Sequence, residues 1–379
     1  MARVIFVTGS LPHGGAERHA IALMNRLAER GHQCHAIYIK NSGEKPDCPR
    51  LGDGGSMHCL DAARYLDLRA VADFATRICA IQPSLVVAAN PYALMYSSLA
   101  LRRSGVRVPL VVTFHTTRLL GAKEWLQMLF YRPFFWSADC LVFVCAKQMR
   151  YWLRRGVFSR RNAMIYNGVD TEAFCDKWRP HERQALRRVL GFSDADYVIG
   201  ISALLRPEKN HAQLVEAVAL LRKRGIPARA LMIGDGTMRA AVEALARSLE
   251  VQSDVVITGL KRDVRPYVVA CDCMALCSFT ETFSLAAIEA MAMGKPVVHS
   301  DVGGAAEMIV PGRNGFLFPV GDTKAFADKL ALLASREVRT RMGQDARAIA
   351  TARFSEVTMV DRYDRMLLEI GRGCESHSA

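Results

Sequence analysis

Short apolar runs alternate with longer amphipathic stretches along the whole 379-residue chain. The apolar runs are typical of strands buried on both faces of a parallel sheet. The amphipathic stretches, such as 17–30 and 66–81, are typical of helices that cover those faces. The predicted strands are residues 3–8, 33–39, 85–89, 110–113, 140–144 and 163–165, then 197–202, 230–233, 255–258, 273–276 and 296–299. This alternation predicts an α/β fold of parallel sheets.

The pattern restarts near residue 197 after a charged segment, which predicts two doubly wound domains of the Rossmann type. The length of the chain also suits two domains better than one. We place the N-terminal domain at residues 1–170 and the C-terminal domain at 171–354. A last amphipathic helix, residues 355–371, is a candidate to pack back on the first domain. Ligands of such folds bind at the carboxyl ends of the strands, so we expect a site in a cleft between the domains.

The composition, 51% hydrophobic and 23% charged, is that of a globular protein with ample material for two cores. No apolar run approaches the roughly 20 residues of a membrane span. The first run, residues 4–7, is too short for the hydrophobic part of a secretory signal. We therefore expect a cytoplasmic protein.

Neither the cysteines nor an acidic pair predicts a metal site. The tightest cysteine group is Cys271, Cys273 and Cys277, and all three lie in or beside an apolar strand-like run without the Cys-x-x-Cys spacing of a zinc site. We interpret them as buried free thiols. Asp194 and Asp196 form an Asp-x-Asp pair, but they precede a predicted strand and so lie away from the expected site. We expect no metal and no cofactor.

The net charge of +13 is concentrated in the first domain. Residues 1–170 carry 22 Lys and Arg against 11 Asp and Glu, whereas residues 171–379 carry 28 against 26. This imbalance favours an anionic partner, namely a membrane surface, a phosphorylated lipid or glycan, or a nucleic acid. A solvated basic surface without a partner is the alternative.

One stretch of the basic domain, residues 119–136, is dense in aromatic and aliphatic side chains and is bordered by Arg118, Lys123 and Arg132. A helix lying on an anionic membrane has this composition. A helix packed into the core with one aromatic edge has it too. The charge of the same domain favours membrane contact.

Two motifs of the first domain follow predicted strands. Gly14 and Gly15 come after the first strand and open a helix, where backbone N–H groups attract anions. The spacing of a dinucleotide fingerprint is absent, so a plain turn is an equal alternative. His115 follows the strand at 110–113 and is placed to hydrogen-bond a substrate hydroxyl or polarise a reacting group, although histidines at strand ends are often structural.

In the second domain, Arg206 and Lys209 follow the first strand at the start of a helix. A forked guanidinium and a compact ammonium at a helix N-terminus suit a diphosphate, although a surface loop tolerates the same residues. Gly234 and Gly236 form a tight turn after the next strand and are candidates for a nucleotide pocket wall. Gly303 follows the strand at 296–299 in the same way.

Two glutamates, Glu281 and Glu289, are eight positions apart in a run that begins as a loop and opens a helix predicted at 285–293. If the helix covered both, the carboxylates would lie on neighbouring faces roughly 12 Å apart. One carboxylate would stand at the anion-attracting helix mouth and the other deeper along the wall. This spacing suits an elongated ligand with hydroxyls at both ends and a phosphate between, such as a sugar nucleotide. Two surface acids on a solvated helix are the alternative.

Taken in order, these motifs resemble those of the GT-B fold, family 4 glycosyltransferases, a large retaining group with many members in bacterial glycan and lipopolysaccharide biosynthesis. The resemblance covers nearly the whole chain. Its motifs are Gly14-Gly15-Ala16-Glu17-Arg18, His115, Asn167-Gly168-Val169-Asp170, Arg206 with Lys209-Asn210, Gly234-Asp235-Gly236, and Glu281 and Glu289 followed by residues 290–298.

The resemblance implies that the second domain holds a nucleotide-sugar donor and the first binds the acceptor. It implies that Glu289 holds the ribose, Glu281 the donor sugar, and Arg206 with Lys209 the diphosphate, without a metal. It also implies that His115 contacts the donor sugar. The remaining implied donor contacts are Gly14, Gly15, Gly234, Gly236, Phe283, Ser284 and Leu285.

The chain departs from the family pattern at Thr282, where a Gly usually follows the first Glu. Thr tolerates a positive φ poorly, which puts the shape of the Glu281 loop and the sugar preference in question. We expect the Lys209 and Glu281 side chains to face solvent in the empty site.

The interpretation is a metal-independent, retaining hexosyltransferase. It would move a hexose or N-acetylhexosamine from a nucleotide-sugar, with UDP favoured, to a lipid-linked, lipopolysaccharide, capsule or O-antigen glycan. We expect it at the inner face of the cell membrane as a peripheral protein. A nucleotide-sugar epimerase on the same frame is one alternative. A basic nucleic-acid-binding protein is another, although the aromatic motifs of common RNA-binding modules are absent and we expect no nucleic acid.

Overall fold

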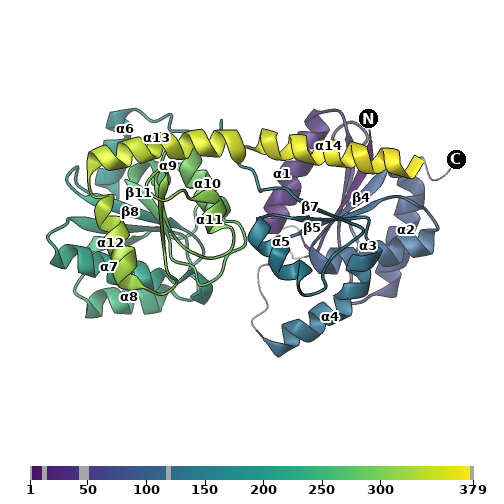
Figure 1. Cartoon of the computed structure of the whole chain (residues 1–379), viewed down its shortest axis with the longest axis horizontal. Coiled ribbons are helices and arrows are strands. Elements are labelled where there is room, and N and C mark those ends of the chain that lie inside the picture. The colour runs from purple at the N-terminus through teal and green to yellow at the C-terminus, as the bar shows by residue number, and fades with distance from the viewer. Residues whose placement is uncertain (1, 11–14, 42–50, 117–120, 376–379) are drawn as a thin grey trace. The chain divides into compact units, whose positions relative to one another are not determined.

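The computed structural model describes residues 2–10, 15–41, 51–116 and 121–375 (Figure 1). The chain forms two compact units: unit 1 comprises Met1–Asn167 with Glu356–Ala379, and unit 2 comprises Gly168–Ser355. The first junction lies three residues before the position suggested by the sequence. The chain returns to unit 1 for its last helix.

Unit 1 is built on a seven-stranded parallel sheet with the order β3-β2-β1-β4-β5-β6-β7. Its strands are β1 (Arg3–Thr8), β2 (Gln33–Tyr38), β3 (Ser56–Cys59), β4 (Leu85–Ala89), β5 (Leu110–Phe114), β6 (Cys140–Phe143) and β7 (Arg161–Met164). Its helices are α1 (Gly15–Glu29), α2 (Leu68–Ile81), α3 (Asn90–Ser104), α4 (Ala122–Ser137), α5 (Ala146–Leu153) and α14 (Glu356–Glu375). The strand order reverses between β1 and β4, which is the arrangement of a doubly wound sheet.

Both faces of this sheet are buried, because successive side chains of a strand point to opposite sides. On β1, Ile5 and Val7 belong to a core shared with α2 and α3, whereas Val4 and Phe6 belong to a second core shared with α1 and α14. This two-sided burial explains why the strand sequences are continuously apolar rather than alternating.

Helix α14 is part of the second core of unit 1. Its residues Met359, Val360, Tyr363 and Leu367 are buried there. Arg26 of α1 pairs with Glu356 at 2.8 Å, and Arg30 pairs with Asp364 at 3.1 Å, so ion pairs border the apolar contact. Helix α14 is therefore an integral part of unit 1, although it follows unit 2 in the sequence.

Unit 2 has a six-stranded parallel sheet with the order β10-β9-β8-β11-β12-β13. Its strands are β8 (Tyr197–Ser202), β9 (Ala228–Ile233), β10 (Val255–Ile257), β11 (Cys273–Leu276), β12 (Val297–Ser300) and β13 (Gly315–Phe318). Its helices are α6 (Pro180–Val189), η1 (Pro207–Lys209), α7 (His211–Lys223), α8 (Arg239–Ser248), η2 (Gln252–Asp254), α9 (Arg265–Ala270), α10 (Leu285–Ala292), α11 (Ala305–Met308), α12 (Thr323–Leu332) and α13 (Arg336–Arg353). The order reverses between β8 and β11.

The expected pair of doubly wound parallel sheets is confirmed, but two strands were not predicted. These are β3 and β13, which form one edge of each sheet. Each has a half-buried centre and carries only two or three apolar residues. An edge strand needs fewer apolar side chains than a central one, so its sequence signal is weaker.

Six of the nine described cysteines are buried as free thiols, in agreement with the sequence interpretation, and Cys79 is exposed. Burial raises the pKa of Cys34, Cys271 and Cys273 to about 12, which keeps them protonated. The described residues include no cluster of three or more side chains suited to a metal. None of the described helices combines the length and apolarity needed for a membrane span.

We predict that Leu367→Ala lowers the free energy of unfolding of unit 1 by about 2–5 kcal/mol, because it removes a buried side chain and leaves a cavity. The matched control is the neighbouring Leu368→Ala, since Leu368 is 49% exposed and should change stability by less than about 0.5 kcal/mol. Urea unfolding of both variants measures the difference. Equal losses would contradict the placement of α14 in the core.

Candidate functional site

In unit 2, the candidate site residues follow four neighbouring strands. Arg206 and Lys209 follow β8, the glycines at 234 and 236 follow β9, Glu281 follows β11, and Gly303 follows β12. All four strands are parallel, so these loops lie at the same edge of the sheet. The structure therefore gathers the motifs of the second domain at the carboxyl ends of its central strands.

The loop after β9 contacts the loop after β8 through backbone atoms. A Cβ atom on Gly234 would lie 2.1 Å from the carbonyl oxygen of Ala203, and one on Gly236 would lie 2.5 Å from that of Leu205. The Leu205 amide donates to the Asp235 carbonyl at 3.0 Å. Glycine is required at both positions because any side chain would push the two loops apart.

The loop after β12 supports the loop that carries Glu281. Gly303 has a φ of +52°, and a Cβ atom there would lie 2.1 Å from the carbonyl oxygen of Glu281. The Gly304 amide donates to the Thr282 carbonyl at 2.7 Å, and the Ser300 hydroxyl donates to the Ser278 carbonyl at 2.7 Å. These contacts fix the backbone on both sides of Glu281.

Lys209 and Glu281 form an ion pair across two of these loops. The Lys209 ammonium donates to Oε1 of Glu281, which also accepts a hydrogen bond from the Ser278 hydroxyl at 3.1 Å. Their side chains are 27% and 15% exposed. The expectation that both would face solvent is therefore wrong, because each is held by the other.

The two cations at the end of β8 differ in setting. Arg206 lies immediately before η1 in extended backbone and is exposed. Lys209 is the last residue of η1, and Asn210, with a φ of +51°, separates it from α7. Lys209 therefore precedes the first turn of α7 instead of forming part of it.

Helix α10 carries only one of the two glutamates. It begins after Ser284, whose hydroxyl accepts a hydrogen bond from the Ala287 amide at 3.3 Å. Glu281 lies in the preceding loop, so the axial distance calculated for two helical glutamates does not apply. Glu289 is only 5% exposed, which excludes the alternative of two solvated surface acids.

The residues between the glutamates are well packed. Phe283 is 5% exposed and contacts Phe354 with ring centroids 5.5 Å apart, and Leu285 is half-buried. Thr282 is absent from the residues with positive φ. The chain thus builds the Glu281 loop without left-handed backbone at Thr282.

In unit 1, the loop that carries His115 is held by α3 and α5. The His115 amide donates to Oδ1 of Asn90 at 2.9 Å. From α5, Gln148 donates to the carbonyl of Phe114 at 2.8 Å, and the Trp152 indole donates to that of Thr116 at 3.0 Å. The backbone is therefore anchored on both sides of His115.

The His115 ring packs against His19 of α1, with centroids 4.8 Å apart, and His19 in turn contacts Tyr363 of α14 at 5.6 Å. Burial lowers the pKa of His19 to about 4. Burial and then the neighbouring His19 lower the pKa of His115 well below its usual value. Both imidazoles are neutral at pH 7.

Sequence reasoning missed His19. The available signal was its position one helical turn after Gly15, which is the first residue of α1. The other glycine of that motif, Gly14, lies outside the described residues.

Comparison with known proteins identifies the class of protein to which this fold and this arrangement of loops belong. The family model described as Glycosyltransferase Family 4 matches residues 13–173, and that of Glycosyl transferases group 1 matches residues 182–349. Putative glycosyltransferase EpsD of Bacillus subtilis (strain 168) is 32% identical over 269 residues, which are 69% of each chain. The N-acetyl-alpha-D-glucosaminyl L-malate synthase of Bacillus anthracis is 26% identical over 95% of each chain.

Solved structures give the same fold. Anabaena HepE, in complex with UDP and glucose, superposes with a TM-score of 0.82 at 21% identity, over 97% of this chain and all of that one. WaaG, a glycosyltransferase involved in lipopolysaccharide biosynthesis, superposes with a TM-score of 0.72 at 18% identity, over 96% and 99%. The chain belongs to the family 4 glycosyltransferases and is an enzyme of that class with the GT-B fold.

Proposed function

We propose that the protein is a retaining transferase that moves a hexose or N-acetylhexosamine from a UDP-sugar to a lipid-linked, lipopolysaccharide, capsule or O-antigen glycan. The observation that carries the proposal is the Lys209–Glu281 ion pair beside Arg206 at the carboxyl ends of β8 and β11. This pairing presents a fixed cation and a sugar-binding carboxylate at one point of the sheet edge. Unit 2 would then hold the donor and unit 1 the acceptor.

The choice of UDP is supported by similar proteins. HepE has been solved with UDP and with UDP-glucose, and WaaB is a lipopolysaccharide outer core galactosyltransferase. The Bacillus anthracis relative is named for an N-acetylglucosaminyl transfer. The UDP and UDP-glucose bound by HepE indicate which nucleotide-sugars should be tried first.

The physical basis of the reaction is electrostatic. Cleavage of the donor places negative charge on the departing diphosphate, and positive charge develops on the anomeric carbon. Arg206 and Lys209 would stabilise the diphosphate, with Glu281 holding the ammonium in place. Because these cations are part of the chain, we propose that no metal ion is needed. The acceptor hydroxyl would attack from the face that the diphosphate leaves, which retains the anomeric configuration.

The other candidate residues would orient the donor. Glu289, buried on α10, would accept hydrogen bonds from the ribose hydroxyls, and Glu281 would accept them from the sugar. His115 is neutral, so it would hydrogen-bond a sugar hydroxyl rather than act as a cation. The main-chain amide of Gly15, at the start of α1, would contribute a donor to the phosphates.

We also propose that α4 contacts an anionic membrane. One face of α4 packs into the core through Met128, Tyr131 and Phe135. The opposite side exposes large apolar side chains, namely Leu126 (71%), Leu129 (53%), Phe130 (51%) and Trp136 (47%). Lys123 lies at the start of this helix, and the Arg155 guanidinium lies 5.7 Å from the Trp125 ring. Apolar side chains bordered by cations fit an anionic lipid surface, which is also where a lipid-linked acceptor resides.

We predict that Lys209→Ala and Glu281→Ala each slow the release of UDP from a UDP-sugar about 10²- to 10³-fold, because each removes an electrostatic contact to the donor. Lys223→Ala, which removes an exposed lysine at the end of α7, should leave the rate unchanged. A panel of UDP-, GDP- and ADP-sugars identifies the substrate for the assay. Circular dichroism should show that all variants are folded, and an unchanged rate in either site variant would contradict the proposal.

We predict that excess EDTA leaves the rate of donor turnover unchanged, because the cations that stabilise the diphosphate are side chains. The measurement compares UDP release before and after chelation. A rate that collapses with EDTA and recovers with Mg²⁺ or Mn²⁺ would refute metal independence while leaving the transferase assignment intact.

We predict that the protein co-sediments with phosphatidylglycerol vesicles more than with phosphatidylcholine vesicles, and that added salt weakens the binding. The double substitution Leu129→Ser with Phe130→Ser should reduce sedimentation, because it removes exposed apolar area on α4. Val189→Ser, at an 83% exposed apolar residue of unit 2, is the matched control. Equal binding by both variants would rule out α4 as the contact.

A further inference from the structure

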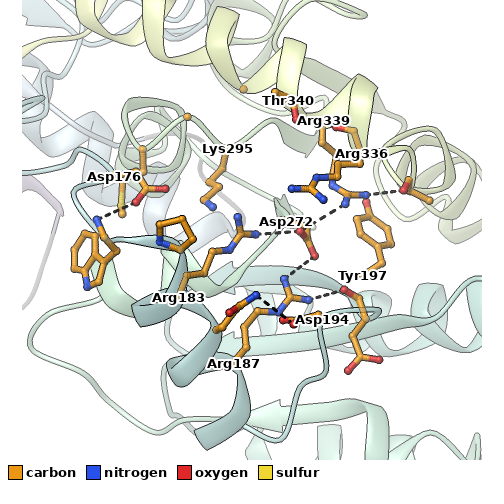
Figure 2. A pocket seen from close by; sticks show the side chains of 18 of the residues that line it. Asp176, Arg183, Arg187, Asp194, Tyr197, Asp272, Lys295, Arg336, Arg339 and Thr340 are labelled. Atoms are coloured by element: carbon orange, nitrogen blue, oxygen red, sulfur yellow. Dashed lines mark hydrogen bonds and ion pairs between the residues drawn. The ribbon is translucent and has the colours of Figure 1, made fainter.

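A cavity lies at the end of the unit 2 sheet opposite to the candidate donor site. Figure 2 shows the side chains that line it. Its volume is about 1040 Å³. Tyr197 is the first residue of β8, Asp272 directly precedes β11, and Lys295 precedes β12, so the cavity borders the amino ends of these strands. Because β8 spans six residues, the two edges are about 20 Å apart. The cavity is therefore distinct from the transferase site.

Cationic side chains from three parts of unit 2 line the cavity. Helix α6 contributes Arg183 and Arg187, the segment before β12 contributes Lys295, and α13 contributes Arg336, Arg339 and Arg347. Four carboxylates also line it: Asp176, Asp194, Asp196 and Asp272. The lining thus has an excess of two positive charges.

Part of this charge has a structural role. Asp272 pairs with Arg183 at 3.1 Å, Arg187 at 3.3 Å and Arg339 at 3.7 Å, and it accepts the Val198 amide at 2.8 Å. Figure 2 shows three of these side chains converging on the carboxylate. The Asp272 carboxylate holds α6 and α13 to the sheet through these three ion pairs. Because it supplies one negative charge for three guanidiniums, part of the positive charge is uncompensated.

The other carboxylates of the lining accept hydrogen bonds from uncharged groups, and one of them also lies near Arg229. Asp196 accepts the Ser193 amide at 2.7 Å and lies 3.5 Å from Arg229. Asp194 accepts from Gln184 at 3.3 Å, and Asp176 accepts from the Trp178 amide at 3.3 Å. None of the three is paired with a cation of the lining in the described part of the chain.

Lys295 is a buried cation of the lining that forms no ion pair among the described residues. It is only 5% exposed, and its ammonium donates to the main-chain carbonyls of Val269 at 3.1 Å and Cys271 at 2.8 Å. An ammonium has three donors, and no carboxylate of the described residues pairs with this one. Burial and then the nearby Arg183 lower the pKa of Lys295 to about 8, while Asp176 and Asp272 act in the opposite direction. An anion in the cavity would relieve both effects.

Two further donors point to a missing acceptor. Arg187 is 5% exposed, and its Nε is buried without a hydrogen-bond partner among the described residues. Arg336 opens α13, next to the capping residue Ser335, and makes no ion pair among them. A helix N-terminus adds partial positive charge to the same wall.

We propose that this cavity is a second ligand site that binds a phosphorylated small molecule, with Lys295, Arg187 and Arg336 as the phosphate-binding residues. A phosphate monoester carries a charge of about −1.5 to −2 at pH 7, which matches the excess of the lining. The volume exceeds that of a phosphate ion and suits a sugar phosphate. Trp178 and Tyr197, which also line the cavity, supply apolar surface for the organic part.

The test is calorimetric titration of the full-length protein with glucose 1-phosphate and with inorganic phosphate, in the presence of saturating UDP to occupy the donor site. Binding should persist under these conditions and in Lys209→Ala, because neither affects the second cavity. Arg336→Glu should weaken binding at least tenfold while leaving the basal rate of donor turnover unchanged. Arg247→Glu, a charge reversal at an exposed position of α8 that does not line the cavity, should bind as the parent does.

Lys295→Met is the second variant, since it keeps the length of a buried side chain while removing its charge, and it should also weaken binding tenfold or more. If Lys295→Met does not fold, the exposed Arg336→Glu still decides the question. Loss of binding with UDP or in Lys209→Ala would place the anion in the donor site and overturn the proposal. The proposal would also be overturned if no binding were measured, or if Arg336→Glu bound the phosphates as tightly as the parent. It would be overturned as well if Arg336→Glu weakened binding to phosphatidic acid vesicles but not to the soluble phosphates.

Discussion

The candidate donor site of unit 2 depends on the contact between two backbones at Gly303. A side chain at this position would collide with the carbonyl of Glu281, and the adjacent amide of Gly304 binds the carbonyl of Thr282. The loop after β12 therefore fixes the position of the loop after β11. That position allows Glu281 to contact the ammonium of Lys209. Close backbone packing, rather than a helix, is what brings the carboxylate and the cation together.

The two ends of the strands in the unit 2 sheet differ in how their charged side chains are compensated. At the carboxyl ends of the strands, the half-buried Lys209 is paired with one carboxylate, that of Glu281, and Arg206 is exposed. At the amino edge, three arginines share Asp272 and a buried lysine has only carbonyl partners. A buried cation without a matching anion raises the free energy of the folded state. The charges at the amino ends of the strands are therefore less well compensated than those at the carboxyl ends.

The sequence predicted the strands that are buried on both faces, because continuous apolar runs identify them, and it missed β3 and β13 at the edges. It predicted which residues follow the strands, since that needs only the order of elements. It did not predict that Lys209 and Glu281 pair, because the partners are 72 positions apart and their contact depends on loop packing. Nor could it identify the basic cavity, whose arginines lie on two helices separated by most of unit 2 and look like ordinary surface charge in the sequence.

The titration behaviour of the candidate residues limits the chemistry of the site. His115 and His19 are neutral at physiological pH because burial disfavours their charged forms, so neither supplies a proton from an imidazolium. Lys209 forms an ion pair with the Glu281 carboxylate. The Lys209 ammonium of unit 2, held by Glu281, is suited to stabilise negative charge on a leaving group. Departure of a diphosphate needs this kind of stabilisation, since its low basicity removes the need for an acid.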